Sequence, residues 1–253
     1  MARIVVFDSG FGSLSVIRPI QKAIKSDLIY YADQKNFPYG KKSRSQLTRI
    51  ITNRIKFLEE KFNPDLIVVG SNTPSLLVEI NKKNVIKVLP PIKMAAKVSV
   101  TGNIAILATL AAVKSKKLSD FIKKNRLPKH INVKKIDASR LVQLVESAKF
   151  IDNENLCNAT IRKVLSAQFS KYNIDVATLS STHLPFLLPF LQKQFPYVTF
   201  LDPAQEIANK VRKIIGKKSS KRNSMKIFTS SNPEKFQNHL WKMGIKKKVS
   251  FLN

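Results

Sequence analysis

The sequence predicts an α/β fold made of two similar parallel-sheet domains with a cleft between them. Short apolar runs alternate with amphipathic stretches along the chain, and one strand-and-turn pattern recurs about 110 residues later. This alternation is typical of parallel sheets joined by right-handed helical crossovers. The 253 residues, 43% of them hydrophobic, are enough for two cores of about 100–150 residues each.

The predicted strands are short runs rich in Val, Ile and Leu. Several are almost continuously apolar, as expected where helices cover both faces of a parallel sheet. A further strand and helix are expected within residues 224–243, after an exposed basic connection at residues 216–222. The eight main strand predictions are Arg3–Asp8, Leu28–Ala32, Leu66–Gly70, Val85–Leu89, Ile104–Ala108, Ile131–Ile136, Val176–Ser180 and Val198–Leu201.

The clearest helix is predicted over residues 44–62. Ser43 and Gln46 have the spacing of a capping box at its start, and Asn63–Pro64 is expected to end it. Its apolar face recurs at helical spacing and consists of Leu47, Ile50, Ile51, Ile55, Leu58 and Phe62.

An internal repeat links the two halves of the chain. Leu66–Pro74 is an apolar strand that runs into a polar turn, and Val176–His183 repeats this pattern. Pro74 and Pro185 mark the start of the helix that follows each turn. Ligands of open α/β sheets bind at the carboxyl ends of strands, so these two turns are candidates for a ligand site.

The net charge is +29, from 45 Lys and Arg against 16 Asp and Glu. The excess is spread over the chain, although residues 204–253 alone hold 13 basic and 2 acidic side chains. Such a field attracts polyanions such as nucleic acid; the alternative is a Lys-rich solvated surface. Aromatic residues are not interleaved with the lysines, so base stacking is not predicted.

Cysteine and hydropathy patterns limit the class of protein. The one cysteine, Cys157, excludes an internal disulfide and a multi-cysteine metal site. We expect it to be a buried side chain in a helix over residues 155–169.

Apolar stretches fall short of the roughly 20 residues of a membrane span, and no secretory signal pattern is present. A cytoplasmic protein is therefore expected, with a homodimer left open.

Four polar turns follow or flank the predicted strands. The composition of each turn alone is common, because Ser, Thr, Asn and Gly dominate turns. The first turn is rich in glycine, which permits a tight turn whose backbone N–H groups face an anion. The four are Asp8–Ser15, Phe37–Gly40, Ser71–Thr73 and Ser181–His183.

In this order and spacing the turns resemble the aspartate/glutamate racemase family. The resemblance covers nearly the whole chain and includes Leu144–Glu146 and the closing segment Phe228–Phe236. It implies two α/β domains with the active site between them. It also implies that residues 94–203 form a second domain inserted into a first one, which residues 1–93 and 204–253 form.

The resemblance further implies a cofactor-independent racemase of acidic amino acids, with no metal and with an acidic amino acid or small dicarboxylate as ligand. In the family, one cysteine removes the α-proton and an opposite cysteine delivers another, in amino-acid metabolism for the cell wall. Glu146 matches a glutamate near the second cysteine. The positions that match substrate-binding residues are Asp8, Ser9, Tyr39, Gly40, Asn72, Thr73, Thr182 and His183.

Both family cysteines are replaced by serine here, at Ser71 and Ser181. A thiol ionises near pH 8.5, whereas an alcohol is a far weaker acid, taken here as comparable to bulk water. The gap is on the order of 10 kcal/mol, comparable to the 8–23 kcal/mol that whole enzymes commonly supply. Two-thiol racemisation is therefore predicted to be lost or weak, unless Asp8 assists Ser71 and His183 or Glu146 assists Ser181.

Three functions stay open at this point. The first is a racemase-type enzyme with weak or altered chemistry, and the second is a non-catalytic ligand-binding or regulatory descendant. The third, compatible with either, is association with nucleic acid or another polyanion. A hydrolase is disfavoured because no Gly-x-Ser-x-Gly elbow surrounds the Ser-x-His turn. His130 and His239 have no metal-ligand spacing.

Overall fold

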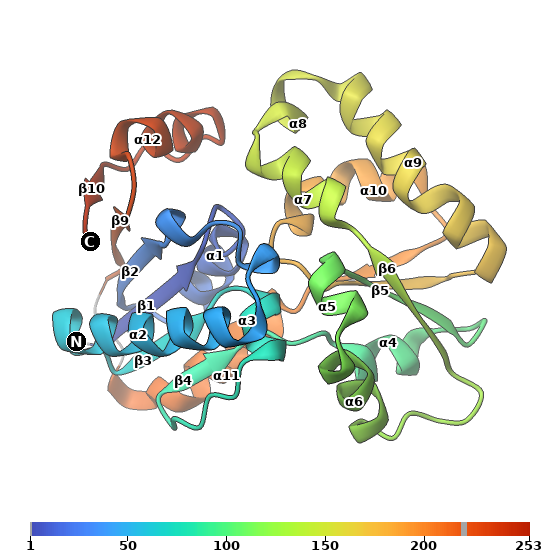
Figure 1. The fold of residues 1–253 in the computed structure, drawn as a ribbon, viewed down its shortest axis with the longest axis horizontal. Helices are drawn as coiled ribbons and strands as arrows, with labels where there is room; N and C mark the ends of the chain where they lie inside the picture. The colour runs from blue at the N-terminus through green and yellow to red at the C-terminus, as the bar shows by residue number, and fades with distance from the viewer. Residues whose placement is uncertain (1, 219–221) are drawn as a thin grey trace. The chain divides into compact units, whose positions relative to one another are not determined.

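The computed structural model describes residues 2–218 and 222–253 (Figure 1). The chain divides into two compact units, Met1–Val88 with Ala204–Asn253, and Leu89–Pro203. Each unit is a parallel sheet flanked by helices, which confirms the predicted α/β class. Of the predicted basic connection at 216–222, residues 219–221 lie outside the described residues.

The sheet of the first unit has the strand order β10-β9-β2-β1-β3-β4, and all of its strand pairs are parallel. The C-terminal segment completes this sheet, because β9 pairs with β2 along its whole length. β10 was not predicted from the sequence. The strands are β1 (Arg3–Asp8), β2 (Asp27–Ala32), β3 (Leu66–Val69), β4 (Val85–Lys87), β9 (Ser224–Thr229) and β10 (Val249–Phe251).

Helices cover both faces of this sheet. The apolar stripe of α2, including Leu47 and Ile51, packs against Val5 and Phe7 of β1. Side chains alternate between faces along a strand, so Ile4 and Val6 point to the other face. There α1 and α11 pack against each other behind the sheet in Figure 1. The helices are α1 (Leu14–Ala23), α2 (Arg44–Phe62), α3 (Asn72–Leu77), α11 (Ala204–Ile215) and α12 (Pro233–Lys242).

The second unit has a parallel sheet in the order β6-β5-β7-β8. One face packs Leu107 and Leu179 against Ile161, Leu165 and Phe169 of α9. The elements are α4 (Ile92–Val98), β5 (Asn103–Ala108), α5 (Leu110–Lys114), α6 (Lys116–Lys124), β6 (Asn132–Asp137), α7 (Ser139–Glu146), α8 (Lys149–Asp152), α9 (Glu154–Tyr172), β7 (Val176–Leu179), α10 (Leu188–Gln194) and β8 (Thr199–Leu201).

The predicted helix over residues 44–62 is confirmed as α2, with both of its end signals. Gln46 N donates to Ser43 Oγ at 3.3 Å and Ser43 N donates to Gln46 Oε1 at 3.0 Å, which completes the capping box. Asn63 ends the helix in the left-handed region at φ 42°.

Cys157 is fully buried in α9, as expected, and packs in the core of the second unit. Burial raises the pKa of its thiol to about 11, with a further contribution from Glu154. A thiol of this kind stays protonated at neutral pH and is a poor nucleophile.

The internal repeat extends further than the sequence pattern suggested. α2 and α9 are both 19 residues long, and each ends at an asparagine in the left-handed region, Asn63 and Asn173. Two residues later comes an aspartate, Asp65 or Asp175, and then a four-residue strand. The two units therefore present their serine turns on the same local scaffold.

Within residues 2–218 and 222–253, none of the helices combines the length and apolar character that crossing a membrane requires.

Candidate functional site

The first unit places two of its polar turns at neighbouring strand ends. β1 ends at Asp8 and pairs with β3, which ends just before Gly70 and Ser71. Asp8 and Ser9 are both buried, and Ser9 N donates to Asp8 Oδ1 at 2.7 Å. The Tyr30 hydroxyl donates to the Gly10 carbonyl, which anchors the first turn.

A glycine is required where these two turns meet. A Cβ atom at Gly70 would overlap Cβ of Ser13 and lie 3.2 Å from the carbonyl oxygen of Phe7. The backbone before Ser71 is therefore pressed against the first turn, and a larger residue at position 70 would push the two turns apart.

Ser71 leads directly into α3. It is the residue before the helix, but its hydroxyl forms no capping bond to the helix backbone. Asn72 is buried, and its Nδ2 donates to the Val88 carbonyl at 3.2 Å. In the part of the chain that the structure describes, no group donates to the buried Oδ1 of Asn72. This acceptor is therefore unsatisfied within the described part of the protein.

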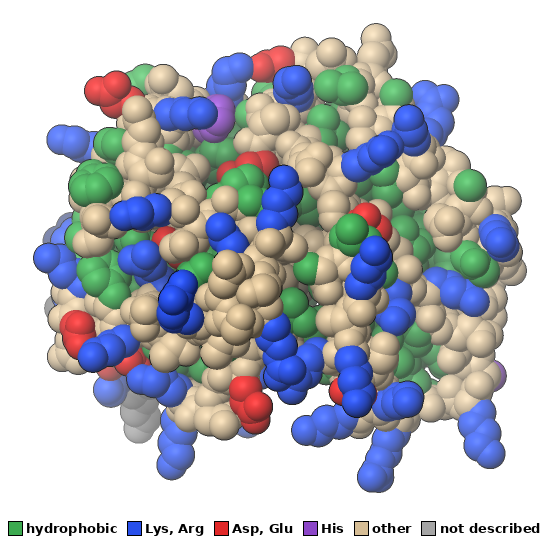
Figure 2. All heavy atoms as spheres, in the orientation of Figure 1, with side chains coloured by type: hydrophobic (Ala, Val, Ile, Leu, Met, Phe, Trp, Pro, Cys, Tyr) green, Lys and Arg blue, Asp and Glu red, His purple; other side chains and the backbone are tan. Residues whose placement is uncertain are grey.

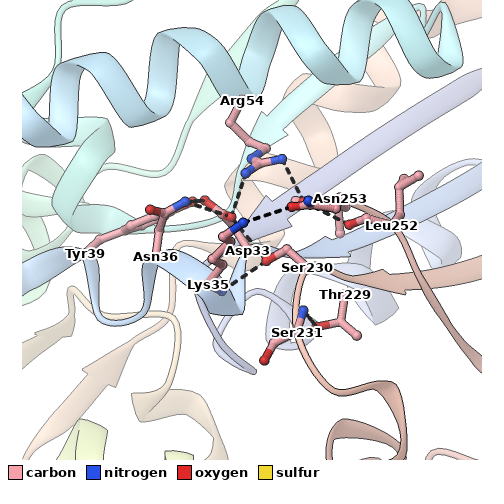
Figure 3. Close-up of polar contacts among 11 residues, drawn as sticks. Asp33, Lys35, Asn36, Tyr39, Arg54, Thr229, Ser230, Ser231, Leu252 and Asn253 are labelled. Atoms are coloured by element: carbon pink, nitrogen blue, oxygen red, sulfur yellow. Dashed lines mark hydrogen bonds and ion pairs between the residues drawn. The ribbon is translucent and has the colours of Figure 1, made fainter.

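The Tyr39 loop is held by a buried acid (Figure 3). Tyr39 and Gly40 lie in a 3-10 turn, Tyr39–Lys41, that contacts α3. The Tyr39 hydroxyl donates to Asp33 Oδ2 at 2.9 Å. Burial, with the charges of Asp33 and Asp8, raises the pKa of Tyr39 well above its usual value. The phenol therefore stays protonated and keeps donating to Asp33.

Asp33 is itself fully buried and multiply bonded. Its Oδ1 lies 3.0 Å from Arg54 Nη2, and both of its oxygens accept from Asn36 Nδ2. Ser230 Oγ donates to it at 3.4 Å. Burial nevertheless raises the pKa of the Asp33 carboxyl, since desolvation outweighs the opposing effects of Arg54 and the hydrogen bonds.

This network ties the C-terminal segment to the Tyr39 loop, as Figure 3 shows. Arg54 Nη1 donates to the Tyr31 hydroxyl at 2.7 Å, and that hydroxyl donates to the Leu252 carbonyl at 3.3 Å. The sequence patterns did not identify Asp33, Arg54 or Ser230. One signal was present, because Asp33 directly follows β2 and Asp8 is the last residue of β1, so both carboxylates lie at strand ends.

In the second unit, three consecutive polar residues follow β7. Ser181, Thr182 and His183 are all buried. Ser181 Oγ lies 3.5 Å from His183 Nδ1, and His183 Nε2 lies 2.8 Å from Oε2 of Glu146, the last residue of α7. An imidazole held by a carboxylate can accept a hydroxyl proton, so Glu146 and His183 could activate Ser181.

Within each unit, the structure places some of the predicted residues on neighbouring elements: β1 pairs with β3, the Tyr39–Lys41 turn contacts α3, and Glu146 contacts His183. In the first unit the predicted residues are Asp8, Ser9, Tyr39, Gly40, Ser71, Asn72 and Thr73, and in the second they are Glu146, Ser181, Thr182 and His183. Among the described residues, no group of three or more His, Cys, Asp or Glu side chains could hold a metal ion.

The comparisons with known proteins agree on one enzyme name. The chain is 32% identical to glutamate racemase of Bartonella quintana over 267 residues, which covers 98% of this chain and 97% of the relative. It is 31% identical to glutamate racemase of Actinobacillus pleuropneumoniae serotype 5b, covering 84% and 81% of the two chains. No family model matches the chain.

Solved structures share the fold. A glutamate racemase isoform of Bacillus anthracis superposes with a TM-score of 0.85 at 24% identity, covering 100% of this chain and 97% of the other. Glutamate racemase of Escherichia coli, solved with L-glutamate and the activator UDP-MurNAc-Ala, also gives 0.85 at 24% identity, covering 99% and 98%.

Proposed function

The chain belongs to the aspartate/glutamate racemase family, and we propose that it binds an acidic amino acid without the two-thiol racemisation of that family. Related structures hold D-glutamate in Francisella tularensis and L-glutamate in Escherichia coli. In the first unit the residues proposed to bind the ligand are Asp8, Ser9, Tyr39, Gly40, Asn72 and Thr73. In the second unit Thr182 and His183 are the residues that match substrate-binding positions of the family.

The observation that carries this proposal is the unsatisfied acceptor at Asn72. Its Oδ1 is buried and receives no hydrogen bond from the described residues. An unmade hydrogen bond of this kind costs about 1–3 kcal/mol. The α-ammonium of an amino acid carries the donors that this oxygen lacks, and Asp8 supplies a carboxylate in the same unit.

Loss of ordinary catalysis follows from the serines. Ser71 and Ser181 match the cysteine positions of the family, and a serine hydroxyl is a far weaker acid than a thiol, by about 7 pKa units. Neither hydroxyl can therefore populate its anion at neutral pH as a thiol can. Binding is expected to survive because the carboxylate- and amine-contacting residue types are retained.

Calorimetric titration with L- and D-glutamate and L- and D-aspartate tests the proposal. We expect binding of at least one of them and no α-proton exchange above buffer in heavy water. Asn72→Ala should weaken binding about tenfold, the equivalent of a lost hydrogen bond. Asn209→Ala, at an exposed position of α11, serves as the matched control. Folded protein that binds no acidic amino acid would contradict the proposal.

A second candidate function is slow proton exchange on one side of the ligand. The distances of 3.5 Å from Ser181 Oγ to His183 Nδ1 and of 2.8 Å from His183 Nε2 to Glu146 favour it. We then expect α-proton exchange of one enantiomer without racemisation, and loss of that exchange in His183→Ala. Exchange that is unchanged in His183→Ala would exclude this route.

A further inference from the structure

An open surface cavity of about 490 Å³ lies in the C-terminal segment of the first unit, and none of its lining residues belongs to the polar turns described above. Its lining residues are Gln237, Trp241, Lys246, Lys247 and Lys248. This volume is within the roughly 300–1,000 Å³ of small-molecule sites. Gln237 and Trp241 are one helical turn apart on α12, and the three lysines follow in the next loop. The cavity is therefore formed by one face of α12 and the chain that folds back along it.

The turn after α12 explains why the lysines lie beside the helix. Gly244 has a φ of 75°, in the left-handed region that glycine adopts without strain. Ile245 N donates to the Leu240 carbonyl at 2.8 Å and Gly244 N to the Trp241 carbonyl at 2.9 Å. This pair of bonds is the Schellman motif, and it reverses the chain direction.

The side chain of Gln237 holds the returning loop in place. Its Nε2 donates to the Lys247 carbonyl at 2.6 Å, and its Oε1 accepts from Val249 N at 2.8 Å. The other face of α12 is buried through Phe236, which stacks on Phe11 with ring centroids 4.8 Å apart. Both walls of the cavity are thus fixed to the fold.

The lining has an exposed aromatic ring and unpaired cations. Trp241 is 58% exposed although it is the largest apolar side chain of the protein. Among the ion pairs of the described residues, none uses Lys246, Lys247 or Lys248. The lining includes no carboxylate. A ligand that fits these groups carries negative charge next to a flat ring.

The wider surface favours a polymer over a small anion. Lys and Arg side chains are spread over the face seen in Figure 2, with few Asp or Glu between them. The net charge of +29 adds a long-range attraction for a chain of phosphates. Proteins that bind single strands combine such a field with aromatic rings on which bases stack.

We propose that this cavity binds single-stranded nucleic acid, with a base stacked on Trp241 and the adjoining phosphates held by Lys246, Lys247 and Lys248. The proposal is independent of the amino-acid site. It replaces the sequence-based expectation that bases would not stack, because the turn at Gly244 brings Lys246, Lys247 and Lys248 beside Trp241. Binding is expected to be indifferent to sequence, because every base offers a ring face and the lysines contact only phosphate.

Trp241 is the only tryptophan of the chain, so its fluorescence reports directly on the cavity. Titration of the full-length protein at low salt with a short oligodeoxythymidylate should quench this fluorescence to saturation. A duplex of the same length should quench it less, because its bases are already stacked. Absence of quenching by the oligonucleotide would overturn the proposal.

Variants then separate stacking from charge, with anisotropy of a fluorescein-labelled oligonucleotide as the measurement. Trp241→Ala should lower affinity about 5- to 150-fold, the range for loss of one stacked base, whereas Trp241→Phe should retain most of it. Because Trp241 is exposed, neither variant is expected to unfold the protein. Equal affinity of Trp241→Ala and the parent protein would overturn the proposal.

A matched pair of triple variants tests the lysines. Lys246→Ala with Lys247→Ala and Lys248→Ala should reduce the slope of log affinity against log salt by about 2, at roughly 0.7 per phosphate contact on a single strand. The control removes the same charge from exposed residues of α6, namely Lys116, Lys123 and Lys124, and should leave the slope nearly unchanged.

Two outcomes would assign the effect to the general positive field instead. The first is an equal loss of affinity in both triple variants. The second is equal quenching of Trp241 by heparin or by vesicles of anionic lipid, which carry charge but no bases. Either result would overturn the proposed stacking site.

Discussion

β3 and β7 carry Ser71 and Ser181 beyond their carboxyl ends, 110 residues apart in the chain. Each strand follows a 19-residue helix that ends at a left-handed asparagine, and each is preceded by an aspartate. Up to the end of the strand, the two regions are therefore built from the same local signals.

The two regions differ beyond the strand. Ser71 leads at once into α3, and its hydroxyl caps nothing in that helix. Ser181 lies in a turn whose histidine is 3.5 Å away and is bonded to Glu146. The position before each serine differs too, since a Cβ at Gly70 would overlap Ser13 whereas Ser180 Oγ is 2.8 Å from Thr178 Oγ1.

This comparison shows that a shared scaffold does not give the two serines equal chemistry. The scaffold brings each hydroxyl to the end of a strand. Among the contacts that the structure describes, only the Ser181 hydroxyl lies next to an imidazole that is itself held by a carboxylate. If either hydroxyl moves a proton, Ser181 is the better placed, because a base next to the hydroxyl is what activates a nucleophile of this type.

The largest expected effect comes from restoring both thiols. Ser71→Cys combined with Ser181→Cys should raise glutamate racemisation by at least about 1,000-fold, since a thiol near pKa 8.5 populates its anion at neutral pH. Circular dichroism of the amino acid measures this directly. Each single variant should exchange the α-proton more than it racemises. A double variant that binds glutamate yet stays inactive would show that other substitutions also disable the site.

The next largest effect is on stability, at the residues that precede the two serines, Gly70 and Ser180. Gly70→Ala should destabilise the protein by about 1–3 kcal/mol, because the added methyl overlaps Ser13 in a packed region. Ser180→Ala removes only the hydrogen bond between the hydroxyls of Ser180 and Thr178 and should cost about 0.5–1.5 kcal/mol. Urea unfolding measures both. Equal costs would mean that the two turns are equally tightly packed.

Glu146→Ala should remove the 2.8 Å bond to His183 and cost about 1–3 kcal/mol of stability, as expected for a buried polar group that loses its partner. The counterpart in the first unit, Asn72→Ala, removes a 3.2 Å bond to Val88 but also the unsatisfied Oδ1, so it should cost less than about 1 kcal/mol. Thermal unfolding gives both values. A larger loss for Asn72→Ala would reverse the ranking of the two turns.

The smallest effect is on acid stability. Burial alone would raise the pKa of Asp175, but the hydrogen bonds from Ser99 and from the Thr101 and Val100 amides together outweigh it and lower that pKa below its usual value. The Arg3 amide and Lys218 lower the pKa of Asp65.

Both carboxylates therefore add stability above the unfolded pKa near 3.9, and this contribution is lost as pH falls through the lower folded pKa. Asp175→Asn and Asp65→Asn should each make the free energy of unfolding fall less steeply as the pH is lowered. Asp175→Asn should do so more, because three donors converge on Asp175 and the Lys218 partner of Asp65 is exposed. Urea unfolding between pH 3 and 7 distinguishes them, and an unchanged pH dependence in both variants would contradict the assignment.

Local signals in the sequence were sufficient for the α/β class, the eight strand positions and the ends of α2. Apolar periodicity, a capping box and a proline after asparagine act within a few residues, so they can be recognised in the chain without its fold. The same holds for Ser71 and Ser181, which short turn motifs place after apolar strands.

The partners of these residues became visible only in three dimensions. Tyr39 is held by Asp33 and Arg54, and Ser230 joins them from nearly 200 residues away. His183 is held by Glu146 from another helix, and Trp241 meets Lys246–Lys248 because the chain reverses at Gly244. β10 was also missed, since three residues with one buried side chain carry little periodic signal. Such contacts depend on how strands pair and where the chain turns back, and no pattern along the sequence encodes which distant side chains will then share a buried space.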